Sequence, residues 1–200
     1  MSVFDALFGT TRRAKPKMDP LFALPTALVD LEAEGITPVG VGGLCVRVPE
    51  GGAFTMAATE IGGVLDLYRN EHDLALSTPS DGLGFTWWVL TAKDESSLDD
   101  IVTGLHMVAE ELRQRGYGDA VIAAAFPLEE AREGNFTLIY NYRRGLYYPF
   151  APLAGRRERD NARELRLVGT LPKSLPTEPE IDRWYALWEA PLARPPKGSP

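Results

Sequence analysis

The chain has 200 residues, of which 44% are hydrophobic and 24% charged, and it carries a formal net charge of -7 with a single cysteine. This length and composition indicate one globular domain with a core of ordinary size. One cysteine excludes an internal disulfide and a cysteine-based zinc site, and the acidic balance argues against nucleic-acid binding. No apolar run reaches the roughly 20 residues needed to cross a bilayer, so we expect a cytoplasmic protein.

Residues 1–18 combine a short apolar block with a basic cluster. The apolar residues are Val3, Phe4, Leu7 and Phe8, and the basic ones are Arg12, Arg13, Lys15 and Lys17. Against Asp5 the basic residues give this segment a charge of +3, so the rest of the chain must carry -10 to reach the total of -7. Such a segment can enter the headgroup layer of an anionic membrane, dock on a partner, or fold back on the body. We predict a peripheral membrane contact through Val3, Phe4, Leu7, Phe8, Arg12 and Arg13.

Between residues 19 and 92, helical and strand patterns alternate. Asp19-Pro20 is a favourable helix start, Pro25 interrupts the helix, and Gly35 is a helix stop. The predicted elements are a helix over 26–34, a strand over 44–48, a helix over 54–68, and strands over 74–78 and 85–92. Both faces of residues 85–92 are apolar, which predicts a central strand.

The longest predicted helix covers residues 98–115, where the apolar side chains form one stripe and Gly116 follows as a stop. After it, the patterns predict a strand over 120–126, a hairpin over 136–150, a charged helix over 156–166 and a last short helix after Thr177. In that last helix Ile181, Trp184, Tyr185 and Trp188 share one face. Residues 191–200 read as a disordered tail, which leaves residues 19–190 as one domain.

This order of elements contains too few and too irregular helices for a parallel sheet built from alternating strands and helices. We therefore expect an α+β fold, with a mainly antiparallel, twisted sheet and helices packed on it.

The hairpin at residues 136–150 is rich in aromatic side chains, six of 15, and Arg143-Arg144-Gly145 forms its expected turn. Such side chains either pack into the core and edge of the domain or contact another protein. The same two interpretations apply to the face around Trp184. We predict a partner-binding surface that consists of Tyr140, Tyr142, Arg143, Arg144, Tyr147, Tyr148, Trp184 and Trp188.

Motifs for catalysis, cofactors and metals are weak throughout the chain. Gly40-Val41-Gly42-Gly43 lacks the third glycine and the following helix of a dinucleotide loop, and it is better interpreted as a loop. Neither His72, in a charged turn, nor His106, one turn before Glu110 on a helix, has the further ligands or partners of a metal site or triad. Cys45 alternates with apolar residues and is expected to be buried. We predict no catalytic residue, no cofactor and no metal.

Several blocks along the chain together resemble one family. They are Phe4-Asp5-Ala6-Leu7-Phe8-Gly9, Asp19-Pro20-Leu21-Phe22-Ala23-Leu24-Pro25, Leu105-His106-Met107-Val108, Tyr142-Arg143-Arg144-Gly145, Tyr148-Pro149-Phe150-Ala151-Pro152, Arg159-Asp160-Asn161-Ala162 and Arg183-Trp184-Tyr185-Ala186-Leu187-Trp188. The chain resembles PspAB, the PspA-associated proteins, over residues 4–188. The resemblance implies a role beside PspA, a peripheral coiled-coil protein of the phage-shock envelope-stress response, and implies no enzymatic activity, cofactor or catalytic residue. The order of elements also resembles the secretion-chaperone-like fold, an analogy of fold alone.

Three functions follow as hypotheses. The first is a non-enzymatic adaptor that binds PspA and an anionic membrane surface. The second is a hydrolase that uses His72 or His106, which requires a cleft joining a histidine to a carboxylate and a nucleophile. The third is a chaperone-like homodimer that binds partner segments.

Overall fold

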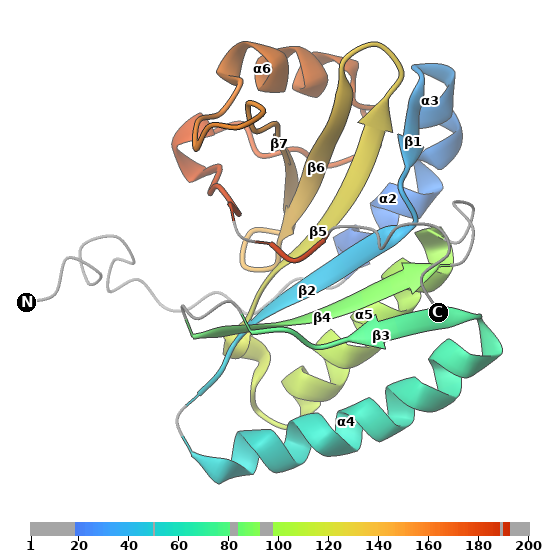
Figure 1. The fold of residues 1–200 in the computed structure, drawn as a ribbon, viewed down its shortest axis with the longest axis vertical. Helices are drawn as coiled ribbons and strands as arrows, with labels where there is room; N and C mark the ends of the chain where they lie inside the picture. Colours follow the sequence, from blue (N-terminus) through green and yellow to red (C-terminus); the bar gives the residue numbers. More distant parts are fainter. Residues whose placement is uncertain (1–18, 50, 81–83, 93–97, 189, 193–200) are drawn as a thin grey trace, which may run out of the picture.

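The computed structural model of the protein describes residues 19–49, 51–80, 84–92, 98–188 and 190–192, which form an α+β fold (Figure 1). The helices are η1 (Asp19–Phe22), α2 (Ala23–Thr26), α3 (Leu28–Ala33), α4 (Gly52–Glu71), α5 (Leu98–Gln114), η2 (Gly118–Ala120), α6 (Asn161–Thr170) and η3 (Ile181–Arg183), of which those marked η are 3-10 helices. The strands are β1 (Ile36–Pro38), β2 (Val41–Arg47), β3 (Leu74–Ser77), β4 (Phe85–Ala92), β5 (Val121–Glu130), β6 (Gly134–Asn141) and β7 (Leu146–Phe150). Among the described residues, no helix is long and apolar enough to cross a membrane.

Within the described residues the seven strands form a single antiparallel sheet in the order β3-β4-β2-β5-β6-β7. The short strand β1 pairs with the far end of β5, so β1 and β2 share one long neighbour. The antiparallel α+β class is therefore as predicted. The central position predicted for residues 85–92 is also correct, because β4 lies between β3 and β2 with side chains buried on both faces.

One face of the sheet is covered by α4, α5 and the segment from η1 to α3 (Figure 1). The apolar stripe of α5 is fully buried against this face, as its spacing predicted. Gly116 ends the helix with a φ of 85°, a conformation that a residue with a Cβ rarely adopts. This layer forms the larger of the two apolar clusters in the domain.

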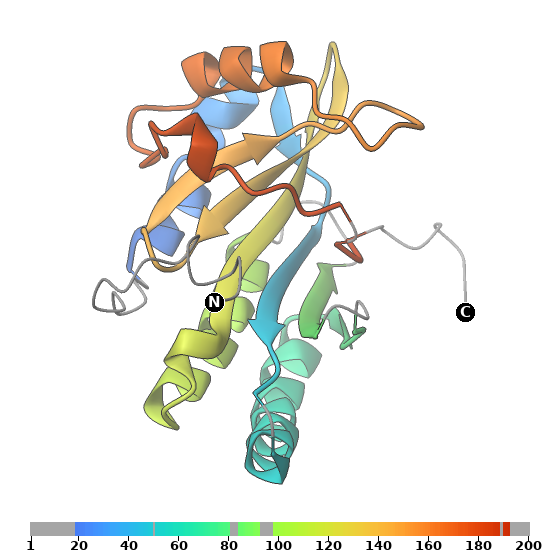
Figure 2. The same cartoon turned by 90° about the vertical axis from the view of Figure 1, so that its left-hand side faces the viewer.

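The opposite face of the sheet is covered by the segment that follows η3 (Figure 2). Val41, Cys45 and Trp87 lie beneath it, and Leu192 packs on top. A Cβ on Gly43 would lie 2.5 Å from a methyl carbon of Leu192, so the segment reaches the sheet only because this position is glycine. The loop predicted around residues 40–43 is thus wrong after residue 40, since these glycines belong to β2.

Three further boundaries differ from the predictions. The helix predicted over 26–34 is the shorter α3, and a separate helix, α2, precedes it and includes Pro25, which was predicted to interrupt the helix. The strand predicted over 120–126 continues as β5 to Glu130, because its charged end pairs with β6 and β1. The helix predicted from residue 156 begins at residue 161, where the carboxylate of Asp160 accepts a hydrogen bond from the Arg163 amide at 2.9 Å and caps the helix.

Helix-interior glycines give a matched pair of stability predictions. A Cβ on Gly104 of α5 would lie 2.6 Å from a methyl carbon of Leu90, which is fully buried, whereas Gly63 of α4 has nothing within 4 Å. Alanine in a helix interior stabilises by up to about 1 kcal/mol relative to glycine, but overpacking a core costs about 1–3 kcal/mol. Gly63→Ala is expected to raise the free energy of unfolding in urea and Gly104→Ala to lower it. Equal shifts of the same sign would contradict the packing described for α5.

Candidate partner-binding site

The four tyrosines predicted to contact a partner are buried in the chain's own core. Tyr140, Tyr142 and Tyr147 pack beneath the helical layer, and Tyr148 packs on the opposite face of the sheet. Burial raises the pKa of Tyr142, Tyr147 and Tyr148 above the ordinary tyrosine value, so their hydroxyls stay protonated even where an exposed tyrosine ionises. The structure corrects the prediction, because both faces of this hairpin are covered by other segments.

The hairpin turn is held from inside the domain. The side chain of Asn141 accepts hydrogen bonds from the amides of Arg143 and Arg144, at 3.0 and 3.3 Å. The Arg144 guanidinium forms an ion pair with Glu178, whose side chain is only 2% exposed. Glu178 in turn accepts a hydrogen bond from the Glu180 amide at 3.1 Å. Arg144 therefore anchors the C-terminal segment, while both arginines of the turn are partly exposed.

The segment anchored by Glu178 continues the hairpin as a short parallel bridge. The Tyr147 amide donates to the Pro176 carbonyl and the Glu178 amide donates to the Tyr147 carbonyl, each at 2.8 Å. Thr177 thereby pairs with Tyr147. This bridge occupies part of the open edge of β7, which would otherwise expose unpaired backbone groups.

After this bridge the helix predicted around Trp184 is replaced by the single turn η3. Trp184 is buried and stacks on Tyr148 with ring centroids 6.3 Å apart, while its indole N–H donates to the Glu178 carbonyl at 3.0 Å. Tyr185 and Ile181 are about half exposed. The four residues therefore do not share one face, because Trp184 is fixed by the sheet beneath it and its backbone is extended.

Trp188 lies at the surface end of a series of contacts that begins in the core. Its ring meets Phe150 edge to face at 5.0 Å, and Phe150 lies 5.5 Å from the guanidinium of Arg159. Arg159 is paired with the buried carboxylate of Glu164 at 2.9 Å. Glu164 also accepts the amide hydrogen bond of Ala151 at 2.8 Å. Trp188 is thus a positioned aromatic ring on a rigid support.

Beside Trp188, two exposed arginines complete a shallow hollow of about 340 Å³. We call this the Arg-Trp hollow; its lining residues are Gly155, Arg156, Arg157 and Trp188. Gly155 has a φ of 71°, and the loop is closed by a hydrogen bond from the Leu153 amide to the Glu158 carbonyl at 2.9 Å. This turn therefore brings Arg156 and Arg157 to the same hollow as Trp188.

The chemistry of the Arg-Trp hollow favours an anionic ligand. Guanidinium groups bind carboxylates through paired, charge-assisted hydrogen bonds, and an indole face accepts apolar or cationic groups. The rest of the surface is acidic, since residues 19–200 carry -10. The sequence prediction included Trp188 but missed Arg156 and Arg157, which it assigned to a helix. Gly155 and the capping residue Asp160 were the available signals for a loop.

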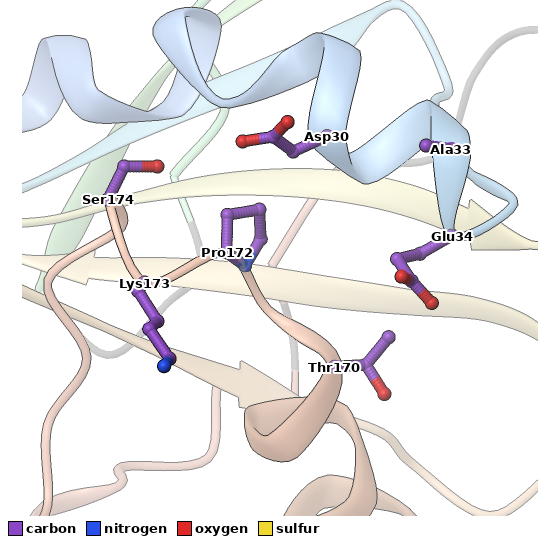
Figure 3. A pocket seen from close by; sticks show the side chains of 7 residues that line it. All are labelled: Asp30, Ala33, Glu34, Thr170, Pro172, Lys173 and Ser174. Carbon is purple, nitrogen blue, oxygen red and sulfur yellow. The ribbon is translucent and has the colours of Figure 1, made fainter.

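A second hollow, of about 370 Å³, lies between α3 and the segment after α6 (Figure 3). Its lining residues are Asp30, Ala33, Glu34, Thr170, Pro172, Lys173 and Ser174. Two carboxylates and one amine give the hollow mixed charge, and the Lys173 side chain points away from Asp30 (Figure 3). This lining selects no single class of ligand.

The histidines considered for catalysis have separate structural contacts. His72 Nδ1 lies 2.8 Å from Asp100 Oδ1, and its ring stacks on Tyr68 with centroids 4.2 Å apart. Burial, together with the charge of Asp100, raises the pKa of Tyr68 to about 12. This cluster ties the end of α4 to the start of α5. The ring of His106 instead packs edge to face with the ring of Phe22, with centroids 4.9 Å apart.

Neither histidine is assembled into a metal site. Glu110 accepts hydrogen bonds from Arg113 at 2.7 Å and from Gln114 at 3.1 Å. The Arg113 bond lowers the pKa of Glu110 to about 2, so this carboxylate already serves the surface of α5. Within the described residues, no three His, Cys, Asp or Glu side chains group closely enough to hold a metal ion.

The residues predicted to contact a membrane lie outside the described residues: Val3, Phe4, Leu7, Phe8, Arg12 and Arg13 all precede Asp19. The tail predicted over 191–200 is described only at Pro191 and Leu192, and Leu192 is buried on the sheet. The domain therefore extends at least two residues beyond its predicted end at residue 190.

Comparison with known proteins identifies one family. The family model of PspAB, PspA associated protein B, matches residues 1–192 of the chain. No curated protein and no solved structure matches it. The secretion-chaperone-like fold accordingly stays a prediction.

The anchoring role of Arg144 predicts a large effect on stability. Arg144→Ala leaves the buried Glu178 carboxylate without its counter-ion, and breaking such a pair costs about 3 kcal/mol or more when both partners are buried. Arg144 is one-third exposed, so we expect a loss of about 2 kcal/mol in the free energy of unfolding. Arg183→Ala is the matched control. Its ion pair with Glu180 is solvent-exposed on both sides, and its removal is expected to cost less than about 1 kcal/mol. Similar losses in urea unfolding for the two variants would contradict the anchoring role.

Proposed function

Because the chain belongs to the PspAB family of PspA associated proteins, we propose that it acts as a non-enzymatic adaptor that binds PspA in the membrane stress response of the phage-shock type. The observation that carries the proposal is the family match, which extends over residues 1–192. The adaptor has two binding surfaces of different chemistry, one for the protein partner and one for the membrane.

The first surface is the Arg-Trp hollow, which receives an acidic segment of the protein partner. Arg156 and Arg157 are exposed on a closed loop, and Trp188 is held in place through Phe150 and Arg159. Aromatic and arginine side chains in such positions contribute most of the binding energy in protein interfaces. An otherwise acidic surface repels an acidic partner, so the hollow also determines where that partner docks.

The second surface is the N-terminal segment, which contacts the anionic membrane at which PspA acts. Four basic residues follow the apolar block, and each contributes about 1 kcal/mol near an anionic surface. The short apolar block keeps this binding weak and reversible. The adaptor is thus a peripheral protein that joins PspA to the membrane surface.

Charge reversal in the hollow tests the first surface. Arg156→Glu replaces a charge-assisted hydrogen-bond donor with a repelling carboxylate, and we expect the affinity for PspA to fall by at least about tenfold, since such a bond contributes about 1.5–3 kcal/mol. Arg132→Glu is the matched control. Arg132 is exposed in the turn between β5 and β6, and its substitution changes the net charge by the same amount. Binding is measured by titration of purified PspA. An unchanged affinity for the Arg156 variant, or an equal fall for both, rejects the hollow as the PspA site.

Liposome pelleting tests the second surface. The full-length protein is compared with a variant that lacks residues 1–17, on vesicles with and without anionic lipid. We expect the full-length chain to pellet with anionic vesicles only, with recovery falling as salt is raised, and the shortened chain to stay in the supernatant. Equal pelleting of the two proteins, or none of either, rejects the membrane contact.

A further inference from the structure

The outward face of α4 carries an exposed apolar stripe that the proposed function does not use. Met56 is 68% exposed, Val64 is 44% exposed and Leu67 is 76% exposed. We call these residues together with Gly63 the α4 stripe, because their spacing places them along one side of the helix, where the exposed carboxylate of Glu60 lies among them. The opposite side of α4 carries the buried residues Phe54, Ala57, Ile61 and Leu65. The helix is therefore apolar on two sides, and one of these sides has no cover within the described residues.

The glycines at the centre of α4 are not required by the packing of the domain. A Cβ on Gly63 would meet nothing within 4 Å, and a Cβ on Gly62 would meet only Trp88 at an ordinary contact distance of 4.0 Å. Each glycine in a helix interior costs roughly 1 kcal/mol relative to alanine. A gap between apolar side chains, made by a glycine, lets another segment approach the helix backbone closely. The glycines therefore leave the backbone at the centre of the α4 stripe open to another segment.

The charged residues of α4 indicate the sign of the segment that docks there. Helix α4 contains three acidic residues, Glu60, Asp66 and Glu71. Its single basic residue is Arg69, so the helix carries a charge of -2. The Glu60 side chain stays 60% exposed although it pairs with Arg115. A segment that covers the stripe therefore needs large apolar side chains and a basic neighbourhood.

We propose that the α4 stripe is the docking surface for the chain's own N-terminal segment, residues 3–17. This segment supplies the required chemistry. Its apolar residues lie against the stripe, and its basic residues lie near the acidic residues of α4; they are Val3, Phe4, Leu7 and Phe8, and Arg12, Arg13, Lys15 and Lys17, respectively. Its net charge of +3 complements the -2 of the helix. The segment and the stripe cover each other's apolar surface, which neither covers alone.

The chain is long enough for this contact. The described structure begins at η1, which packs against α5 through Phe22 and His106. Helix α4 packs on the same helix α5, where Tyr68 approaches Gly104. Packed helix axes lie about 8–10 Å apart, so the path from η1 across α5 to the outside of α4 is a few helix diameters. Residues 9–18 extend over at most about 35 Å, which is sufficient for that path.

The consequence rests on the proposed function of the N-terminal segment. The same four apolar side chains cannot be buried against α4 and in a headgroup layer at once, so the two contacts exclude each other. The docked state withholds the membrane contact, and an anionic surface releases the segment by competition. The α4 stripe thereby becomes a resting position for the membrane-binding segment.

Paramagnetic relaxation in the full-length protein tests the docking directly. A nitroxide on Asn70→Cys reports on the neighbourhood of the stripe, since Asn70 is exposed on α4 and the native Cys45 is buried and shielded from the label. We expect the amide signals of residues 3–8 to lose intensity, with recovery on reduction of the label. A nitroxide on Leu165→Cys is the matched control. Leu165 is 53% exposed on α6, at the opposite end of the molecule from α4 (Figure 1), and its label is expected to leave these signals unchanged.

A disrupting variant and a mixing experiment decide between the remaining outcomes. Leu67→Glu, combined with the label at residue 70, is expected to restore the N-terminal signals while the spectrum of the domain stays folded. Signal loss that is absent, equal for both label positions, or unaffected by Leu67→Glu overturns the proposal. In the mixing experiment, isotope-enriched protein without a nitroxide is combined with nitroxide-labelled protein that is not enriched. Signal loss that appears only in this mixture assigns the segment to a second copy and also overturns the proposal. None of these readouts needs lipid or PspA, so the docking and the proposed function fail independently.

Discussion

The fold depends on the burial of a sheet that is apolar on both faces. Helices α4 and α5 cover one face, whereas no long helix among the described residues covers the other, which contains Trp87 and Tyr148. An extended C-terminal segment covers it instead and reaches the sheet closely at Gly43. Such a segment forms few backbone hydrogen bonds of its own, so side-chain anchors must hold it. Arg144 pairs with the buried Glu178, and Arg159, itself paired with Glu164, donates a hydrogen bond to the Trp184 carbonyl. The position of Trp188 at the surface follows from this covering.

Five arginines in the second half of the chain fall into two groups with different roles. Arg144, Arg159 and Arg163 are turned inward, where each pairs with a carboxylate and fixes one segment to another. Arg156 and Arg157 are exposed on a loop whose ends are held by that inward network. In the proposed function, this order lowers the entropy that is lost when a partner binds. The internal ion pairs thus hold the segments that position Arg156 and Arg157.

Much of the fold could be predicted from the sequence, because the spacing of apolar residues and the positions of breaker residues indicate helices, strands and turns locally. The stripe of α5, the apolar strand β4 and the turn before Gly145 were all recognised from spacing and breaker residues. The candidate site was predicted only at Trp188. Aromatic alternation in the hairpin has the same pattern whether a face is covered or open, so the burial of Tyr140 and Tyr147 could not be read from it. A run of charged residues likewise suggested a helix where the capping by Asp160 starts it five residues later.

The sequence by itself determined the α+β class, the antiparallel character of the sheet, the surplus of negative charge on the body and the basic, apolar N-terminal segment, because composition and periodicity are local properties. The tertiary structure alone decided which apolar surfaces are covered and which charges point outward. The face of Trp184 was folded onto the sheet, while Met56 and Leu67 on α4 were left exposed. That choice depends on contacts between segments far apart in the chain, and no local pattern contains them.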